Sequence, residues 1–148
     1  CDLRKWREIM QAYETGGHAY HTTMPTDALR TFRDVMLETE AYGFDKVMAE
    51  QQELGTKVRA ALESRGVISV AAAGFQAPGV VVSYTSDPEV KSGAKFAAAG
   101  MQIAGGVPLQ VDEGDDFSTF RLGLFGLDKL HNVDRTVASL EAVLDSVL

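Results

Sequence analysis

Two of the chain's three histidines, His18 and His21, lie three residues apart in the segment from Gly16 to Arg30. At that spacing, two imidazoles on one face of a helix can bind the same metal ion. However, a Gly-Gly pair precedes them and a proline follows them, which argues against a helix here. The third histidine, His131, is far away along the chain. We therefore expect no metal site and assign no chemistry to these histidines.

Hydroxyl groups in the same segment offer a different chemistry. Tyr20, Thr22 and Thr23 come shortly before Thr26, where a helix is expected to begin. Hydroxyl donors beside the unpaired N–H groups of a helix N-terminus are suited to hold an anion, most often a phosphate. The alternative is that these are ordinary loop or packing side chains. Spacing alone leaves both interpretations open.

A second candidate site is the segment TFRLGLFG, residues 119–126. In a strand, Phe120, Leu122 and Leu124 share one face, and Arg121, Gly123 and Phe125 share the other. The planar guanidinium of an arginine pairs with a carboxylate through two parallel hydrogen bonds. Gly123 removes a side chain and leaves room for a ligand to approach. The alternative for Arg121 is a structural salt bridge to an acidic side chain, or simple exposure to solvent.

Other familiar motifs are weak or missing. The pair Gly105-Gly106 is interpreted as a turn at which the backbone approaches a ligand, but no GxGxxG or Walker loop supports nucleotide binding. There is no GxSxG motif, and no cysteine is placed as a nucleophile. The lysines lie in charged or helical-surface contexts, which disfavours a desolvated Schiff-base lysine within the chain.

Composition limits the class of protein. The chain has 148 residues, a formal net charge of −7, 45% hydrophobic and 24% charged residues, all typical of one globular domain. The acidic balance argues against binding to nucleic acid or to an anionic membrane, and no apolar run approaches the ~20 residues needed to cross a bilayer. The lone cysteine, Cys1, fits a cytoplasmic location. Because the chain starts with Cys1, we expect it to be an excerpt of a longer protein.

Hydrophobic spacing predicts the elements. Residues 1–25 are irregular or briefly helical. Helices are expected from Thr26 to Gly43, with an apolar stripe from Leu29 to Met36, and from Phe44 to Arg65. Beyond these we expect strands at 67–72, 79–84, 101–104 and 119–125, a helix from Pro88 to about Ala99, a loop over 107–118, and a last helix capped by Asp128. This order predicts an α+β fold, a mainly antiparallel sheet with helices packed on it.

Three separated segments together resemble a known family. They are DLRKW at residues 2–6, AYHTTMPTDALRTFRD at 19–34, and IAGG at 103–106 followed by FRLGLFG and NVDRTVASLEAVL up to residue 144. Their order and spacing are similar to the C-terminal part of class V aminotransferases, pyridoxal-phosphate enzymes of fold type I, and most of all to the alanine–glyoxylate and serine–pyruvate branch. The resemblance covers essentially the whole chain.

The resemblance implies roles for particular residues. Tyr20 and Thr23 would bind the phosphate of pyridoxal 5′-phosphate in the site of the neighbouring subunit. Arg121 would bind the α-carboxylate of the substrate. The Schiff-base lysine would lie upstream, outside this chain, so no catalytic residue is expected within it. Residues 1–25 would be the lead-in from a missing large domain, and residues 26–148 the C-terminal small domain.

The resemblance also implies a function for the parent protein. It would be a homodimeric, cytoplasmic aminotransferase that transfers an amino group between a small amino acid and a 2-oxo acid such as glyoxylate or pyruvate. The chain alone would be inactive. The apolar stripe from Leu29 to Met36 would pack on the missing domain, and its exposure would favour self-association. Two alternatives stay open: a non-catalytic α+β binding domain, and another class V enzyme such as a desulfurase, a lyase or a phosphonate transaminase.

Overall fold

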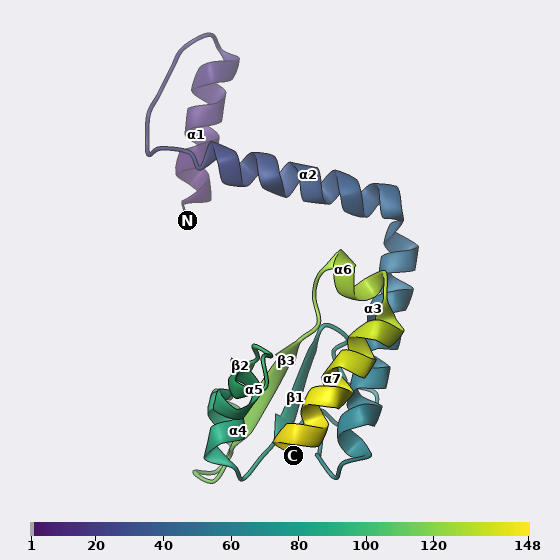
Figure 1. The fold of residues 1–148 in the computed structure, drawn as a ribbon. Coiled ribbons are helices and arrows are strands. Elements are labelled where there is room, and N and C mark those ends of the chain that lie inside the picture. Colours follow the sequence, from purple (N-terminus) through teal and green to yellow (C-terminus); the bar gives the residue numbers. More distant parts are fainter. Residues whose placement is uncertain (1) are drawn as a thin grey trace. The chain divides into compact units, whose positions relative to one another are not determined.

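The computed structural model describes residues 2–148, and Cys1 lies outside the described residues (Figure 1). The chain divides into two compact units, of which the first ends at Glu38 and the second covers Thr39–Leu148. The elements in chain order are α1 (Leu3–Glu14), α2 (Thr26–Tyr42), α3 (Phe44–Glu63), β1 (Val80–Tyr84), α4 (Pro88–Ser92), α5 (Ala94–Ala98), β2 (Ala104–Gly105), β3 (Thr119–Gly123), α6 (Leu127–Leu130) and α7 (Val133–Val147).

The first unit contains α1, a loop and most of α2, and it buries little. The carboxylate of Asp2 accepts hydrogen bonds from the N–H groups of Arg4 and Lys5, at 3.1 Å each, and so caps α1. Ile9 is the one buried hydrophobic side chain among the described residues of this unit. The apolar stripe of α2 is exposed, with Phe32 at 63%. This helix face is therefore not covered by the other described residues of the first unit.

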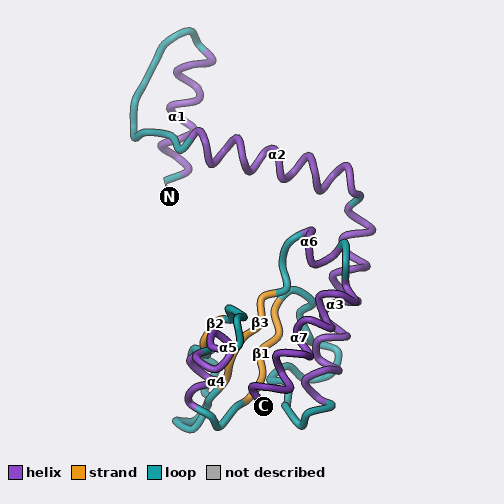
Figure 2. Tube along the Cα trace, viewed as in Figure 1, coloured by secondary structure: helices purple, strands orange, loops and turns teal. Residues whose placement is uncertain are grey.

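The second unit is built on a three-stranded antiparallel sheet in the order β1-β3-β2, drawn in orange in Figure 2. The central strand, β3, pairs with both neighbours. Arg121 lies opposite Val82 of β1 on one side and opposite Ala104 of β2 on the other. The sheet is short, but its register fixes the position of Arg121 along β3 relative to both flanking strands. The predicted α+β class with an antiparallel sheet is confirmed.

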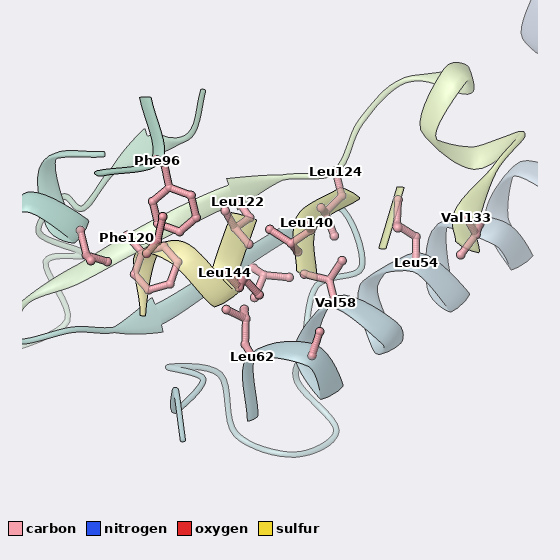
Figure 3. Packing of buried hydrophobic residues seen from close by; sticks show 14 of the residues in the cluster. Leu54, Val58, Leu62, Phe96, Phe120, Leu122, Leu124, Val133, Leu140 and Leu144 are labelled. Atoms are coloured by element: carbon pink, nitrogen blue, oxygen red, sulfur yellow. The ribbon is translucent and has the colours of Figure 1, made fainter. Parts of the chain in front are cut away.

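The hydrophobic core lies on one face of this sheet, where α3 and α7 pack side by side (Figures 1 and 3). Phe96 of α5 packs on Phe120 of β3, with ring centroids 5.7 Å apart. The core residues labelled in Figure 3 are Leu54, Val58, Leu62, Phe96, Phe120, Leu122, Leu124, Val133, Leu140 and Leu144. Their burial supplies the main driving force for folding of the second unit.

A polar stripe on α3 holds the chain that leads into β1. The side-chain amide of Gln51 donates to the carbonyl oxygens of Pro78 at 3.0 Å and Leu124 at 3.3 Å. Arg59, only 7% exposed, donates to carbonyl oxygens of this lead-in, including that of Ala77 at 2.7 Å. Burial lowers the pKa of Arg59 from its usual value. These bonds set the position of β1 beside β3.

The predicted strand over residues 67–72 is wrong. Only one isolated bridge, between Ser69 and Ser83, connects this segment to β1. Two backbone bonds accompany it, from the N–H of Val70 to the carbonyl of Val82 and from that of Tyr84 to the carbonyl of Ile68. The segment then turns away through an alanine-rich run. Because so few ladder bonds form, β-branched residues alone do not make a strand here.

Three other predicted elements need correction. The helix expected from Pro88 to Ala99 is two short helices, because Gly93 between them has φ +82°. The strand expected at 101–104 is shifted to Ala104–Gly105. The last helix is divided into α6 and α7 at residues 131–132, and Asp128 does not cap it. The carboxylate of Asp128 instead accepts a hydrogen bond from Arg135 at 2.9 Å.

Candidate functional site

Arg121 lies in the middle of β3, on the face opposite to the core. Phe120 and Leu122 on either side of it are 0% and 5% exposed, whereas Arg121 is half-buried and Gly123 is exposed. This alternation of inward and outward residues is the period of two expected of a strand. The faces predicted from the sequence for this segment are therefore the faces found in the structure.

The side chain of Arg121 is held at one point only. Its Nε donates a hydrogen bond to the carbonyl oxygen of Gly105, at 2.9 Å. No carboxylate within residues 2–148 forms an ion pair with Arg121, so the alternative of a structural salt bridge is not found in the described chain. The two terminal nitrogens are left without a hydrogen bond from these residues. They are the pair of donors that binds a carboxylate.

The Gly105-Gly106 pair places the carbonyl that Arg121 uses. A Cβ on Gly106 would collide with the backbone of Thr119, and a Cβ on Gly105 would lie 3.2 Å from the carbonyl oxygen of Lys91. The N–H of Gly106 donates to that same carbonyl at 3.2 Å. The two glycines are therefore required for close packing between α4, β2 and β3. Sequence reasoning interpreted them as a turn toward a ligand, because the register of β2 on β3 is not visible in the sequence.

Tyr20 and Thr23 lie together in the first unit, in the loop before α2. Their hydroxyl oxygens are 3.2 Å apart, and either can be the donor. Tyr20 is 78% exposed, so the pair lies on the surface of the first unit. Thr22 is exposed and makes no hydrogen bond to residues 2–148. The structure thus brings together two of the three hydroxyls noted in the sequence, and Arg121 belongs to the other unit.

The histidines take part in ring contacts that sequence reasoning did not find. His21 packs edge-on against Trp6 in the first unit, with ring centroids 5.7 Å apart. His131 packs on Tyr42 in the second unit at 4.2 Å. No group of three or more histidine, cysteine, aspartate or glutamate side chains in the described part of the chain is arranged to hold a metal ion. No local pattern in the sequence could have revealed either ring contact.

A cavity of about 610 Å³ was also missed by sequence reasoning. It lies between α4, β3 and the loop at 107–117, and Lys91, Thr119 and Glu113 are among the residues lining it. The carboxylate of Glu113 shapes the loop, because it accepts hydrogen bonds from the N–H groups of Leu109, Gln110 and Val111. These backbone donors lower the pKa of Glu113 to about 2. The acidic composition of the loop was the only signal available in the sequence.

No protein-family model and no curated protein matches the sequence. Similarity is found at the level of structure. A subgroup IV aspartate aminotransferase from Thermus thermophilus matches with a TM-score of 0.71 and 20% identity, over 97% of this chain and 39% of that one. The chain has the fold of an aminotransferase C-terminal domain. Alanine–glyoxylate aminotransferase from Nostoc sp. matches as well, with a TM-score of 0.64 and 20% identity, over 85% of this chain and 33% of that one.

Ureidoglycine–glyoxylate aminotransferase from Bacillus subtilis is a third structure with this aminotransferase fold, with a TM-score of 0.62 and 22% identity over 95% of the chain and 36% of its own length. The present chain therefore spans between 33% and 39% of these three proteins. The expected fold of an aminotransferase C-terminal domain is confirmed. Of the helices described, none has the length and apolar character required to cross a membrane.

Proposed function

We propose that the chain is the C-terminal domain of a pyridoxal-phosphate-dependent aminotransferase. The parent enzyme would transfer an amino group between a small amino acid and a 2-oxo acid such as glyoxylate or pyruvate. One observation supports this most: in a chain with this fold, Arg121 is held through Nε and has no carboxylate partner within residues 2–148. Two of the similar structures are named for glyoxylate as a substrate, which supports the choice of a 2-oxo acid.

The role proposed for Arg121 is to bind and orient the α-carboxylate. Its two terminal nitrogens donate parallel hydrogen bonds to the two carboxylate oxygens. A substrate held at two points cannot rotate freely, so the bonds at its Cα keep one orientation relative to the reacting groups. Orientation of this kind lowers the entropic part of the activation barrier.

The role proposed for Tyr20 and Thr23 is to hold the phosphate of the cofactor. Two exposed hydroxyls 3.2 Å apart, close to the beginning of α2, are a donor set that suits a phosphate. Pyridoxal phosphate, when bound, supplies the electron sink for the chemistry at Cα. By resemblance to class V enzymes, these hydroxyls serve the site of the neighbouring subunit, so the parent enzyme would be a dimer.

The same proposal implies a domain organisation for the parent enzyme. The lysine that binds the cofactor covalently would lie in a large domain upstream, so the 148-residue chain would be inactive by itself. Residues 1–25 would connect the two domains, and residues 26–148 would form the small domain.

The proposal is tested in two ways. The chain mixed with pyridoxal phosphate should develop no stable absorbance band that borohydride abolishes, whereas the full-length protein should. In the full-length protein, Arg121→Ala should raise the KM for the amino acid strongly, while the absorbance of the bound cofactor is retained. Unchanged kinetics in Arg121→Ala would rule out the role of this arginine.

A further inference from the structure

One glycine of this chain has no structural reason to be glycine. Seven of the 14 glycines have a positive φ, a conformation that disfavours side chains. Six others have a neighbouring atom 3.2 Å or less from the place where a Cβ would stand. Gly123 alone has neither feature, since a Cβ there would meet only Cδ2 of Phe125, at 4.0 Å, which is ordinary van der Waals contact.

A glycine in a strand is unfavourable for the fold. It loses more backbone entropy on folding than alanine does, and it contributes no side chain to packing. Gly123 is the last residue of β3, pairs with Val80 of β1, and is exposed. The described chain would therefore accept alanine at this position, and it would gain stability. Apart from its two chain neighbours, only Cδ2 of Phe125 comes within 4.0 Å of the place where a Cβ on Gly123 would stand, so residues 2–148 leave this place open.

The neighbours of Gly123 indicate what occupies this place. Arg121 comes two residues before Gly123 on β3 and so lies on the same face, about 7 Å away. Phe125 follows the end of the strand, and its Cδ2 lies 4.0 Å from the place where a Cβ on Gly123 would stand. Arg121 reaches toward Gly105 on β2, and its side chain does not fold over Gly123. Phe125 is 63% exposed, and a Cβ on Gly79 would lie 2.6 Å from its ring, so the ring rests on that glycine.

We propose that Gly123 is a specificity-determining residue, which keeps open the space for the carbon skeleton of the substrate whose carboxylate binds Arg121. The ligand class is an α-amino acid and the corresponding 2-oxo acid, with a short side chain because Phe125 borders the space. This inference rests on the proposed function, since it takes Arg121 as the carboxylate-binding group. It assigns to Gly123 a steric role, and to Phe125 the limit on side-chain size.

The test uses Gly123→Ala and Gly123→Val in the full-length protein. The KM for alanine should rise about tenfold in Gly123→Ala and further in Gly123→Val, and larger amino acids should be affected more than smaller ones. A structural role would not give this dependence on substrate size. In the 148-residue chain, the Tm of Gly123→Ala should be unchanged or raised by about 1–3 °C.

A control adds two carbon atoms elsewhere, between the one added by Gly123→Ala and the three added by Gly123→Val. Ala142→Val lies on an exposed part of α7, which packs on the opposite face of the sheet. It should leave the KM for every amino acid unchanged. If Gly123→Val does not fold, Gly123→Ala alone decides the outcome.

Two results would overturn the inference. An unchanged KM in a folded Gly123→Ala protein would show that substrate does not use this space. A lowered Tm of the full-length protein with an unchanged KM would show that another part of the parent polypeptide fills it. Measuring Arg121→Ala in the same assay distinguishes failure of this inference from failure of the proposed function. If Arg121→Ala raises the KM and Gly123→Ala does not, only the inference about Gly123 fails. If neither variant raises the KM, the proposed function fails.

Discussion

The Nε–H of Arg121 donates a hydrogen bond to the carbonyl oxygen of Gly105, across the β2–β3 pair, at 2.9 Å. This bond uses the one guanidinium nitrogen that lies on the side-chain stem. Both terminal nitrogens are left for a ligand, and the hydrogen bond from Nε to Gly105 restricts rotation of the guanidinium plane. Lysine has no group that can take the place of Nε in this arrangement.

Arg121→Lys should therefore impair substrate binding, although less than Arg121→Ala. A lysine keeps the positive charge but loses the second parallel hydrogen bond and the bond to Gly105. In the full-length protein we expect the KM for the amino acid to rise at least about tenfold, which corresponds to roughly 1.4 kcal/mol for one charge-assisted hydrogen bond. Steady-state kinetics measure this, and wild-type KM in Arg121→Lys would show that charge alone is sufficient.

Removing a hydroxyl from the Tyr20–Thr23 pair should weaken cofactor binding. Tyr20→Phe keeps the ring and removes one donor, and Thr23→Val removes the other. Each should raise the Kd of pyridoxal phosphate in the full-length protein at least about tenfold, because hydrogen bonds to a charged group contribute about 1.5–3 kcal/mol and each 1.4 kcal/mol is a factor of ten. Thr22→Val is the matched control, since Thr22 is the neighbouring threonine whose hydroxyl does not pair with Tyr20 and which the proposed phosphate site does not use. If all three variants bind the cofactor equally well, the phosphate role is wrong.

Gly106→Ala should destabilise the second unit strongly. The added methyl group would meet the backbone of Thr119, which cannot move without disturbing the β2–β3 pair. Overpacking of this kind costs about 1–3 kcal/mol. Urea unfolding of the 148-residue chain measures the loss, with Gly123→Ala as a matched control that should not destabilise. Equal stability of the two variants would contradict the contact described for Gly106.

Local patterns in the sequence were sufficient for part of this site. The faces of β3 follow from the alternation of Phe120, Arg121 and Leu122, which depends only on the geometry of a strand. The faces of β3 are determined within a few residues, so spacing carries the information. The choice of Tyr20 and Thr23 came instead from the resemblance to class V aminotransferases, because spacing alone left Thr22 open as well.

Contacts between distant segments could not be obtained in this way. The bond from Arg121 to Gly105 depends on the register of β2 against β3, and the bonds of Arg59 to the lead-in of β1 join residues 18 or more apart. The break at Gly93 was hidden because Val90 and Phe96 on either side are both buried core residues. A helix pattern in the sequence continues across such a glycine, although its φ of +82° ends the first helix.

Glu113 should titrate far below an ordinary glutamate. Its carboxylate accepts three backbone hydrogen bonds from the loop at 109–111, and these donors lower its pKa from 4.5 to about 2. The folded state therefore holds the deprotonated form more strongly than the unfolded state does. The resulting contribution to stability is fully present above pH 4.5 and is lost as the pH falls from there toward 2.

Carbon-13 NMR of the Glu113 side-chain carboxyl in the 148-residue chain measures this directly, and the midpoint should lie near pH 2. Glu113→Gln removes the negative charge and one strong acceptor, so the amide resonances of Leu109, Gln110 and Val111 should shift at pH 7. Asp115→Asn is the control in the same loop, because Asp115 accepts no hydrogen bond from the described residues. A Glu113 midpoint near pH 4.5 would mean that the three N–H groups do not hold its carboxylate in solution, and that the walls of the adjacent cavity are not fixed by this residue.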